Sequence, residues 1–308
     1  MSENNEGKLK KFFKSYHTEN FKWNDFLIVP LFLSLLLLTL GQLVGDLIIN
    51  ATFPKLFNDN VTDYIIFFAM YFSFIGIWVV ALLYFLTPGN RPMFGAIWKK
   101  CKGNTLKNLG IGLLIGFGTN AFCILCAVLN KDIFLYYSGE NFLAILGIFI
   151  AVFIQSSAEE LICRGFLYQR LRRGYKNPLV AIIGNSVLFA LLHIFNPGVE
   201  PIAIVSIVVV GILYSLLVYY FDSIWMPMAI HAGWNFTQSI FFGLPNSGIV
   251  SKFSIFKMDA ASAKDSFAYS TSFGVEATIL AVAVNILCCL IIFYLGRKNN
   301  KKPTDIWN

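Results

Sequence analysis

Residues 142–173 read FLAILGIFIAVFIQSSAEELICRGFLYQRLRR. The apolar part of this run is long enough to cross a bilayer as a helix, which takes about 20 residues. Near its end stand two adjacent carboxylates, Glu159 and Glu160. Insertion scales assign a charged side chain at the bilayer centre a cost of about 2.5–3.5 kcal/mol. We therefore predict that this segment is a membrane helix and that its acidic pair belongs to a functional site.

The composition of the whole chain is that of a membrane protein. Of its 308 residues, 57% are hydrophobic and only 13% are charged, against about 25% charged residues in an average soluble domain. The net charge of +7 comes from basic clusters between apolar runs, a pattern that favours the lipid bilayer over nucleic acid as a partner. Most of the six cysteines lie inside apolar runs, so we expect no disulfide framework.

Apolar windows of membrane-spanning length recur along the chain, and they predict an all-α bundle of about eight transmembrane helices. In the third window Gly112 and Gly116 form a GxxxG pattern, which favours close helix packing. The arginines Arg170, Arg172 and Arg173 at the end of the fourth window are expected to reach into the lipid headgroups. The eight expected ranges are 26–48, 64–87, 108–129, 142–173, 178–196, 201–221, 224–243 and 275–296.

The loops between these ranges alternate in charge. Lysine and arginine gather in both terminal tails and in the second and fourth loops, whereas the first and third loops carry one lysine each, Lys55 and Lys131. Because basic residues accumulate on the cytoplasmic side of a membrane, the tails 1–25 and 297–308 are expected in the cytoplasm. The chain is therefore predicted to be a multi-pass protein of the cell membrane, with residues 246–274 as an extracytoplasmic loop.

The two adjacent glutamates are expected to play different parts. Arg164 follows Glu160 by four residues and can pair with it on one helix face, whereas Glu159 points about 100° away. One carboxylate is then held in an ion pair and the other is left free for chemistry. The structural alternative is a salt-bridge cluster that only anchors the end of the helix.

Two of the three histidines also fall inside predicted membrane helices. If ranges 142–173 and 178–196 form a hairpin, Glu159 and His193 lie about 21 and 22 Å from its turn, at matching depth. His231 lies only about 10 Å into its helix, so its convergence with the other two predicts a recessed turn around Asp222. Asn235 follows His231 by four residues and shares its helix face.

These groups suit two kinds of hydrolytic site. A carboxylate and an imidazole can take a proton from water while an imidazole and an amide stabilise the oxyanion. Alternatively, Glu159, His193 and His231 could hold a zinc ion, the candidate cofactor in that case. The sequence has no HExxH pattern, which removes the commonest signature of zinc peptidases. The residues alone leave both mechanisms open.

Three short motifs in successive apolar segments together resemble the CAAX protease and bacteriocin-processing family, which includes the type II CAAX prenyl endopeptidases. They are Glu-Glu-x-x-x-Arg at residues 159–164, Phe-x-x-x-His at 189–193 and His-x-x-x-Asn at 231–235. The resemblance covers a core at about residues 140–245, between the N-terminal helices 26–129 and the last helix 275–296. It implies an intramembrane endopeptidase, which is either metal-dependent or a glutamate peptidase.

Carried onto this chain, the resemblance implies that Glu159 and His193 activate water and that His231 and Asn235 form the oxyanion site. Glu160 and Arg164 would support the structure or orient the substrate. The implied partner is a peptide or membrane-protein substrate, such as a bacteriocin or pheromone precursor. The alternative hypotheses are a non-catalytic membrane scaffold, such as a bacteriocin-immunity protein, and a proton-coupled transporter. The absence of an inverted repeat argues against the transporter.

Overall fold

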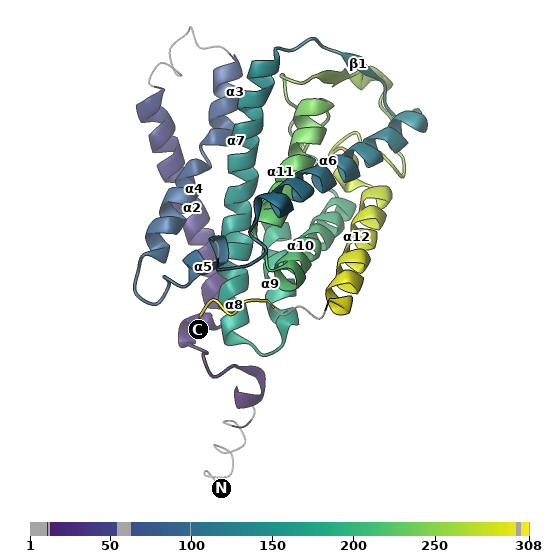
Figure 1. Ribbon diagram of the computed structural model, residues 1–308. Helices are drawn as coiled ribbons and strands as arrows, with labels where there is room; N and C mark the ends of the chain where they lie inside the picture. Colours follow the sequence, from purple (N-terminus) through teal and green to yellow (C-terminus); the bar gives the residue numbers. More distant parts are fainter. Residues whose placement is uncertain (1–10, 12, 54–62, 99, 300–302, 308) are drawn as a thin grey trace.

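A computed structural model describes residues 11, 13–53, 63–98, 100–299 and 303–307. The prediction of an all-α membrane bundle is confirmed (Figure 1). Several of the basic residues behind the predicted sidedness lie outside the described residues: Lys8, Lys10, Lys55, Lys99, Lys301 and Lys302. Within the described residues, six helical stretches are long and apolar enough to cross a membrane. They are α2 (Ile28–Thr52), α3 with α4 (Asp63–Phe72 and Ile75–Phe85), α6 (Leu106–Leu129), α7 with η3 and α8 (Phe142–Glu160, Leu161–Leu167 and Tyr168–Gly174), α10 (Pro201–Phe221) and α12 (Ile279–Lys298).

The predicted count of eight spanning helices is too high. The helix α9 (Pro178–Leu191) has 14 residues, which extend over about 21 Å and fall short of the roughly 30 Å hydrocarbon core. The helix α11 (Trp225–Asn235) has 11 residues and continues for six more as the π-helix η4 (Phe236–Phe241). The apolar ranges 178–196 and 224–243 contain enough residues to span the membrane as helices, but the ends of these ranges fold as loops.

The outside of the bundle is apolar and its inside contains polar groups. Large side chains such as Leu47 on α2, Leu114 on α6 and Leu290 on α12 are exposed. Conversely, Asn185 and Gln238 are fully buried. This distribution suits a protein whose outer surface faces lipid, because buried polar groups must find their hydrogen bonds within the bundle.

Short polar residues begin the helices that hold the polar interior. Asn141 accepts hydrogen bonds from the N–H groups of the first turn of α7, and Asn177 does the same for α9, directly before Pro178. Thr278 caps α12 through the N–H of Ala281. Such caps satisfy N–H groups that a helix start leaves without partners. The predicted last helix therefore begins at Ile279, after a separate 3-10 turn, η6 (Val275–Ala277).

Helices α6 and α11 pack in close contact through the predicted GxxxG pattern. A Cβ atom on Gly112 would lie 2.7 Å from the carbonyl oxygen of Met226, and one on Gly116 would collide with the carbonyl oxygen of Ile230. Only glycine allows the two backbones to approach so closely. This contact fixes the helix that carries His231 against the rest of the bundle.

The two ends of the bundle differ in structure. At one end β1 (Leu135–Tyr137) pairs antiparallel with β2 (Phe256–Met258), which brings the loops on either side of the core together; the 3-10 turn η5 (Ala260–Ser262) follows β2. The described parts of both terminal segments lie at the other end, with η1 (Trp23–Asp25) and α5 (Met93–Ile97) (Figure 1). This arrangement agrees with the predicted separation of loops and tails, and the assignment of one end to the cytoplasm stays a prediction.

Two of the arginines expected to reach the headgroups are buried instead. Arg170 and Arg173 both form ion pairs with Asp25, whose carboxylate lies 2.8 Å from the Nε atom of each arginine. All three residues are at most 5% exposed. Arg172 donates to the carbonyl oxygens of Pro303 and Thr304, which ties the C-terminal segment to the same end. The cluster of arginines thus joins the two terminal segments to α8.

Candidate active site

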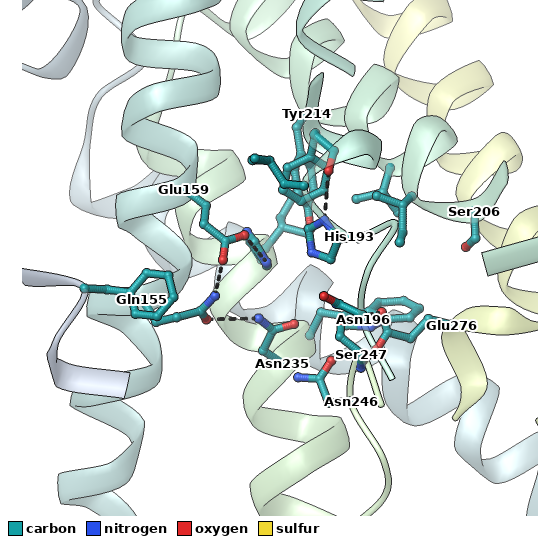
Figure 2. Close-up of a pocket in the computed structure, with 18 of the residues that line it drawn as sticks. Gln155, Glu159, His193, Asn196, Ser206, Tyr214, Asn235, Asn246, Ser247 and Glu276 are labelled. Carbon is teal, nitrogen blue, oxygen red and sulfur yellow. Dashed lines mark hydrogen bonds and ion pairs between the residues drawn. The ribbon is translucent and has the colours of Figure 1, made fainter. Parts of the chain in front are cut away.

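A cavity of about 470 Å³ lies among the helices and collects the predicted site residues. Glu159 from α7, His193 from the turn after α9, and His231 and Asn235 from α11 all line it. Figure 2 shows Glu159, His193 and Asn235 reaching into this space from separate elements. The structure therefore brings together four residues that are spread over 77 positions of the chain. Their individual roles stay predictions.

The Glu159 carboxylate is held at one oxygen only. Its Oε1 atom accepts a hydrogen bond from Nε2 of Gln155, one turn earlier on α7. Its Oε2 atom lies 3.9 Å from Nε2 of His231 and, among the described residues, has no hydrogen-bond partner. The side chain is 13% exposed. This oxygen is the free acceptor that the sequence predicted for one of the two glutamates.

The neighbouring Glu160 is fully buried and makes the predicted ion pair, with Arg164 Nη1 at 2.9 Å from its Oε1 atom. The same oxygen accepts a second hydrogen bond from Nδ1 of His231 at 3.1 Å. Since an ionised carboxylate only accepts, Nδ1 of His231 carries a proton and Nε2 faces the cavity. Glu160 therefore orients an imidazole as well as pairing with Arg164.

Arg164 itself is enclosed by protein groups. Its Nη2 atom donates to the carbonyl oxygen of Gly211 at 3.1 Å, and its guanidinium lies over the rings of Phe189 and Tyr214, at 4.7 and 5.2 Å from their centroids. Aromatic faces stabilise a cation in this position. The Phe189 of the Phe-x-x-x-His motif thus has a partner in the Glu-Glu-x-x-x-Arg motif, which the sequence did not reveal.

His193 enters the cavity without contacting Glu159. Its Nδ1 atom lies 2.8 Å from the carbonyl oxygen of Phe189 and donates to it, so Nε2 remains available to the cavity. Within the described part of the chain, the imidazole within 4 Å of Glu159 is that of His231. The predicted water-activating pair of Glu159 and His193 would therefore work across a gap that a water molecule or substrate fills.

Asn235 completes a chain of polar groups along α7. Its Nδ2 atom donates to Ser156 Oγ at 3.1 Å and to Gln155 Oε1 at 3.3 Å. Gln155 in turn donates to Glu159. The amide of Gln155 thus fixes the position of Asn235 relative to the carboxylate.

Both motif helices change to π geometry directly after their site residues. α7 gives way to η3 after Glu160, and α11 gives way to η4 after Asn235. π-helical turns are rare and are frequently found at functional sites. Because a π turn holds an extra residue, the side chains that follow it face a different direction from those of a regular α-helix.

The residues present do not fit a metal ion as they lie. Among the described residues, no group of three histidine, cysteine or acidic side chains is close enough together to hold one. The Nε2 of His231 is 3.9 Å from Glu159 Oε2, a separation that two ligands of one zinc ion can have, but among the described residues no third ligand lies with them. The mechanism considered below therefore uses protein groups only.

Sequence reasoning missed several polar residues of the cavity. Gln155 precedes Glu159 by four residues in a helix whose first thirteen residues are all apolar, a spacing that could have identified it. Tyr214 on α10 and Glu276 in η6 also line the cavity. Glu276 falls inside the predicted last helix 275–296, whereas in the structure it precedes that helix, and no local pattern marks it as a site residue.

Comparison with known proteins gives two matches. The family described as type II CAAX prenyl endopeptidase Rce1-like matches residues 141–237, which include all three motifs. The uncharacterized protein YyaK of Bacillus subtilis (strain 168) is 30% identical over 226 residues, covering 67% of this chain and 72% of YyaK. No solved structure matches the chain. Neither match supports a metalloprotease or a role in bacteriocin immunity.

Proposed function

Because the chain belongs to the Rce1-like family of type II CAAX prenyl endopeptidases, we propose that it hydrolyses a peptide bond in a peptide or membrane-protein substrate inside the membrane. The observation that carries this proposal is the free Oε2 atom of Glu159, which faces a cavity also lined by two imidazoles and an amide. The carboxylate supplies a base where the substrate's carbonyl group would meet water.

In the proposed reaction, Glu159 accepts a proton from a water molecule placed between its Oε2 atom and Nε2 of His193. The water oxygen attacks the carbonyl carbon of the scissile bond, and an oxyanion forms. As the intermediate collapses, the carbon–nitrogen bond breaks and the proton passes to the leaving amine. Positioned acid–base groups of this kind contribute about 10²–10⁴-fold to rate.

The oxyanion would be stabilised by His231 and Asn235. Glu160 fixes Nδ1 of His231, which leaves Nε2 to face the cavity, where in its protonated form it donates to the oxyanion. Asn235 gives its Nδ2 hydrogens to Ser156 and Gln155 at 3.1 and 3.3 Å, and one of these long bonds would be exchanged for a bond to substrate. Removing a donor of this kind costs about 10²–10³-fold in turnover.

The apolar part of the lining suits a membrane-borne substrate. Leu38 of α2, Met70 of α3 and Phe74, in the turn between α3 and α4, line the cavity on one side. A second hollow, between α2 and α3, is lined mostly by apolar side chains together with Gln42, Asp46 and Ser73, and it shares Met70 and Phe74 with the cavity. A hydrophobic segment could therefore reach Glu159 from between these helices without entering water.

The test compares peptides in membranes from cells that carry the wild-type protein with those from cells that carry Glu159→Gln. The variant keeps the volume of the side chain, so the protein should accumulate normally while specific cleavage products disappear. The matched control is Glu140→Gln, which alters a carboxylate that does not line the cavity. If wild type and Glu159→Gln give the same peptides at equal protein levels, the protein is not a peptidase and the non-catalytic scaffold hypothesis replaces it.

A further inference from the structure

One wall of the cavity comes from outside the residues that match the family. Helix α12 and the turn before it contribute Glu276, Asn285 and Cys288 to the lining, beyond the matched range 141–237. Figure 2 shows Glu276 across the cavity from Gln155 and Glu159. The proposed catalytic steps do not use these side chains. They are therefore candidates for a role in substrate binding rather than in catalysis.

Glu276 is a fixed carboxylate at this wall. Its Oε1 atom accepts hydrogen bonds from the backbone N–H of Ser247 at 2.7 Å and from Nε2 of Gln238 at 3.0 Å. Gln238 is itself held by Nδ2 of Asn120 at 2.8 Å. The second oxygen has only a 3.5 Å contact with Ser247 Oγ. The carboxylate is thus positioned by three elements and keeps an oxygen with capacity for another donor.

The electrostatic surroundings of Glu276 favour a cationic ligand. Among the described residues that line the cavity there is no lysine or arginine, and Glu159 adds a second carboxylate; the basic groups of the lining are the imidazoles of His193 and His231. Burial raises the pKa of Glu276 to about 7, because a shielded carboxylate loses the stabilisation that water gives its charge. A positive group in the cavity would restore that stabilisation.

Asn285 gives a second, independent indication of a ligand. The residue is 3% exposed and lines the cavity from α12. Its Nδ2 atom is shielded from solvent and has no hydrogen-bond partner within the described residues. A buried amide without partners is unfavourable unless something supplies an acceptor. A peptide carbonyl oxygen is the acceptor that a protease substrate brings.

We infer that the α12 wall is a substrate-recognition site for peptides, in which Asn285 donates to a backbone carbonyl oxygen and Glu276 binds an ammonium group of the same peptide. The ammonium group is that of a lysine side chain. Both side chains line the same cavity of about 470 Å³, so a single short stretch of peptide can reach both. This inference rests on the proposed function, and it narrows the substrate to a peptide with a positive charge a few residues from the bound carbonyl.

The test measures binding rather than cleavage, with full-length Glu159→Gln protein in lipid nanodiscs. The probe is a mixture of fluorescent nine-residue peptides of apolar residues with one central lysine, acetylated at the amino terminus. The comparison mixture carries acetyl-lysine at the same position. We expect the lysine mixture to bind at least about tenfold more tightly than the acetyl-lysine mixture. A hydrogen bond between the lysine ammonium group and the buried carboxylate of Glu276 is strong enough to give such a difference. Because the charge is removed from the peptide, this comparison does not depend on the folding of a variant.

Variants of Glu276 and Asn285 then test whether the preference for lysine arises at the α12 wall. Adding Glu276→Gln should abolish the preference for lysine, whereas the control Glu200→Gln, an exposed carboxylate outside the cavity, should leave it intact. Asn285→Leu should weaken binding of both mixtures while leaving thermal stability unchanged or higher, since it replaces an unsatisfied amide with an apolar group. A lower melting temperature with unaltered binding would instead indicate a structural role for Asn285.

The outcomes separate this inference from the proposed function. Equal binding of the two mixtures, no binding of either, or a lysine preference that survives Glu276→Gln overturns the recognition site. Lysine-dependent binding in a wild-type protein that produces no cleavage products keeps the recognition site and refutes the peptidase. Cleavage that does not depend on lysine keeps the peptidase and refutes the recognition site.

Discussion

The Nδ1 atom of His231 lies 3.1 Å from Oε1 of Glu160, the same oxygen that pairs with Arg164. This contact links two motifs that are about 70 residues apart and fixes the tautomer of the imidazole. The Nε2 atom of His231 consequently faces Glu159 across 3.9 Å. The two adjacent glutamates therefore differ in their contacts. Glu160 orients the imidazole of His231 and pairs with Arg164, whereas Glu159 presents a free oxygen to the cavity.

The three histidines provide a matched set of variants. We expect His193→Ala and His231→Ala each to lower turnover by about 10²–10³-fold, the usual cost of losing an acid–base or oxyanion group. His17→Ala is the control, because His17 also bonds the carbonyl oxygen four residues before it, at 3.0 Å, yet it does not line the cavity. Cleavage of a substrate peptide by purified protein measures the effect. Equal losses in all three variants would contradict a specific role for the two cavity imidazoles.

Arg164→Ala should reduce the amount of folded protein rather than turnover alone. The substitution leaves Glu160 buried with its charge uncompensated, a loss that typically costs about 3–5 kcal/mol. The control is Lys252→Ala, which breaks the exposed ion pair of Lys252 with Asp63 and should cost less than about 1 kcal/mol. Yield of monodisperse protein and its melting temperature are the measurements. Normal yield of Arg164→Ala would show that the buried pair does not support the fold.

The sequence predicted the cavity residues better than it predicted the helices around them. Charged and polar side chains inside apolar segments are costly, so Glu159, Glu160, His193 and His231 were identifiable one by one. The lengths of the short membrane helices were not identifiable, because apolar residues continue into the loops that follow α9 and η4. Hydropathy does not distinguish an apolar loop packed inside protein from a helix.

Contacts between distant segments also lay beyond the sequence. Arg170 and Arg173 look like interfacial anchors until Asp25, almost 150 residues away, is placed between them. Glu276 has no motif, and its place in the cavity depends on how the loop through Ser247 folds back. In both cases the partner is set by tertiary packing, which no local spacing encodes.

Gln155 should act as a positioning residue. It donates to Glu159 Oε1 and accepts from Asn235 Nδ2, so Gln155→Ala loosens both the base and the oxyanion donor. We expect turnover to fall by about 10–10²-fold through kcat, with KM changed little, since misplacement of reacting groups by about 1 Å costs that much. Gln155→Glu should be worse than Gln155→Ala, because it sets a second negative charge beside Glu159. A change confined to KM would place Gln155 in substrate binding instead.

Removal of metal should leave turnover unchanged. The described side chains offer no group of three ligands, and the proposed steps use Glu159, His193, His231 and Asn235 alone. Purified protein treated with 1,10-phenanthroline is compared with untreated protein on the same peptide, and a zinc peptidase treated in parallel confirms that the chelator works. Loss of activity that added zinc restores would show that substrate or a rearrangement brings the ligands together, and would favour the metal-dependent alternative.

Glu276 should make stability depend on pH in a predictable direction. Burial raises the pKa of its carboxyl group from an ordinary value of 4.5 to about 7 in the folded protein. Below about pH 4.5 the group is protonated in both states and adds no pH dependence. Between about pH 4.5 and 7 the unfolded chain ionises while the folded protein keeps its proton, so stability falls as pH rises. Above about pH 7 the loss of stability is complete, and it is on the order of 3 kcal/mol.

Glu276→Gln removes this titration, so its melting temperature relative to wild type should increase steadily from about pH 4.5 to 7 and then level off. Any hydrogen bond that the amide loses shifts the difference equally at all pH values and leaves its slope intact. Glu159, His193 and His231 face the same cavity and are unchanged in both proteins, so the comparison is of differences rather than absolute values. Thermal unfolding in nanodiscs across this range provides the data. A difference that stays constant with pH would show that Glu276 ionises normally, and would remove one support of the recognition site on the α12 wall.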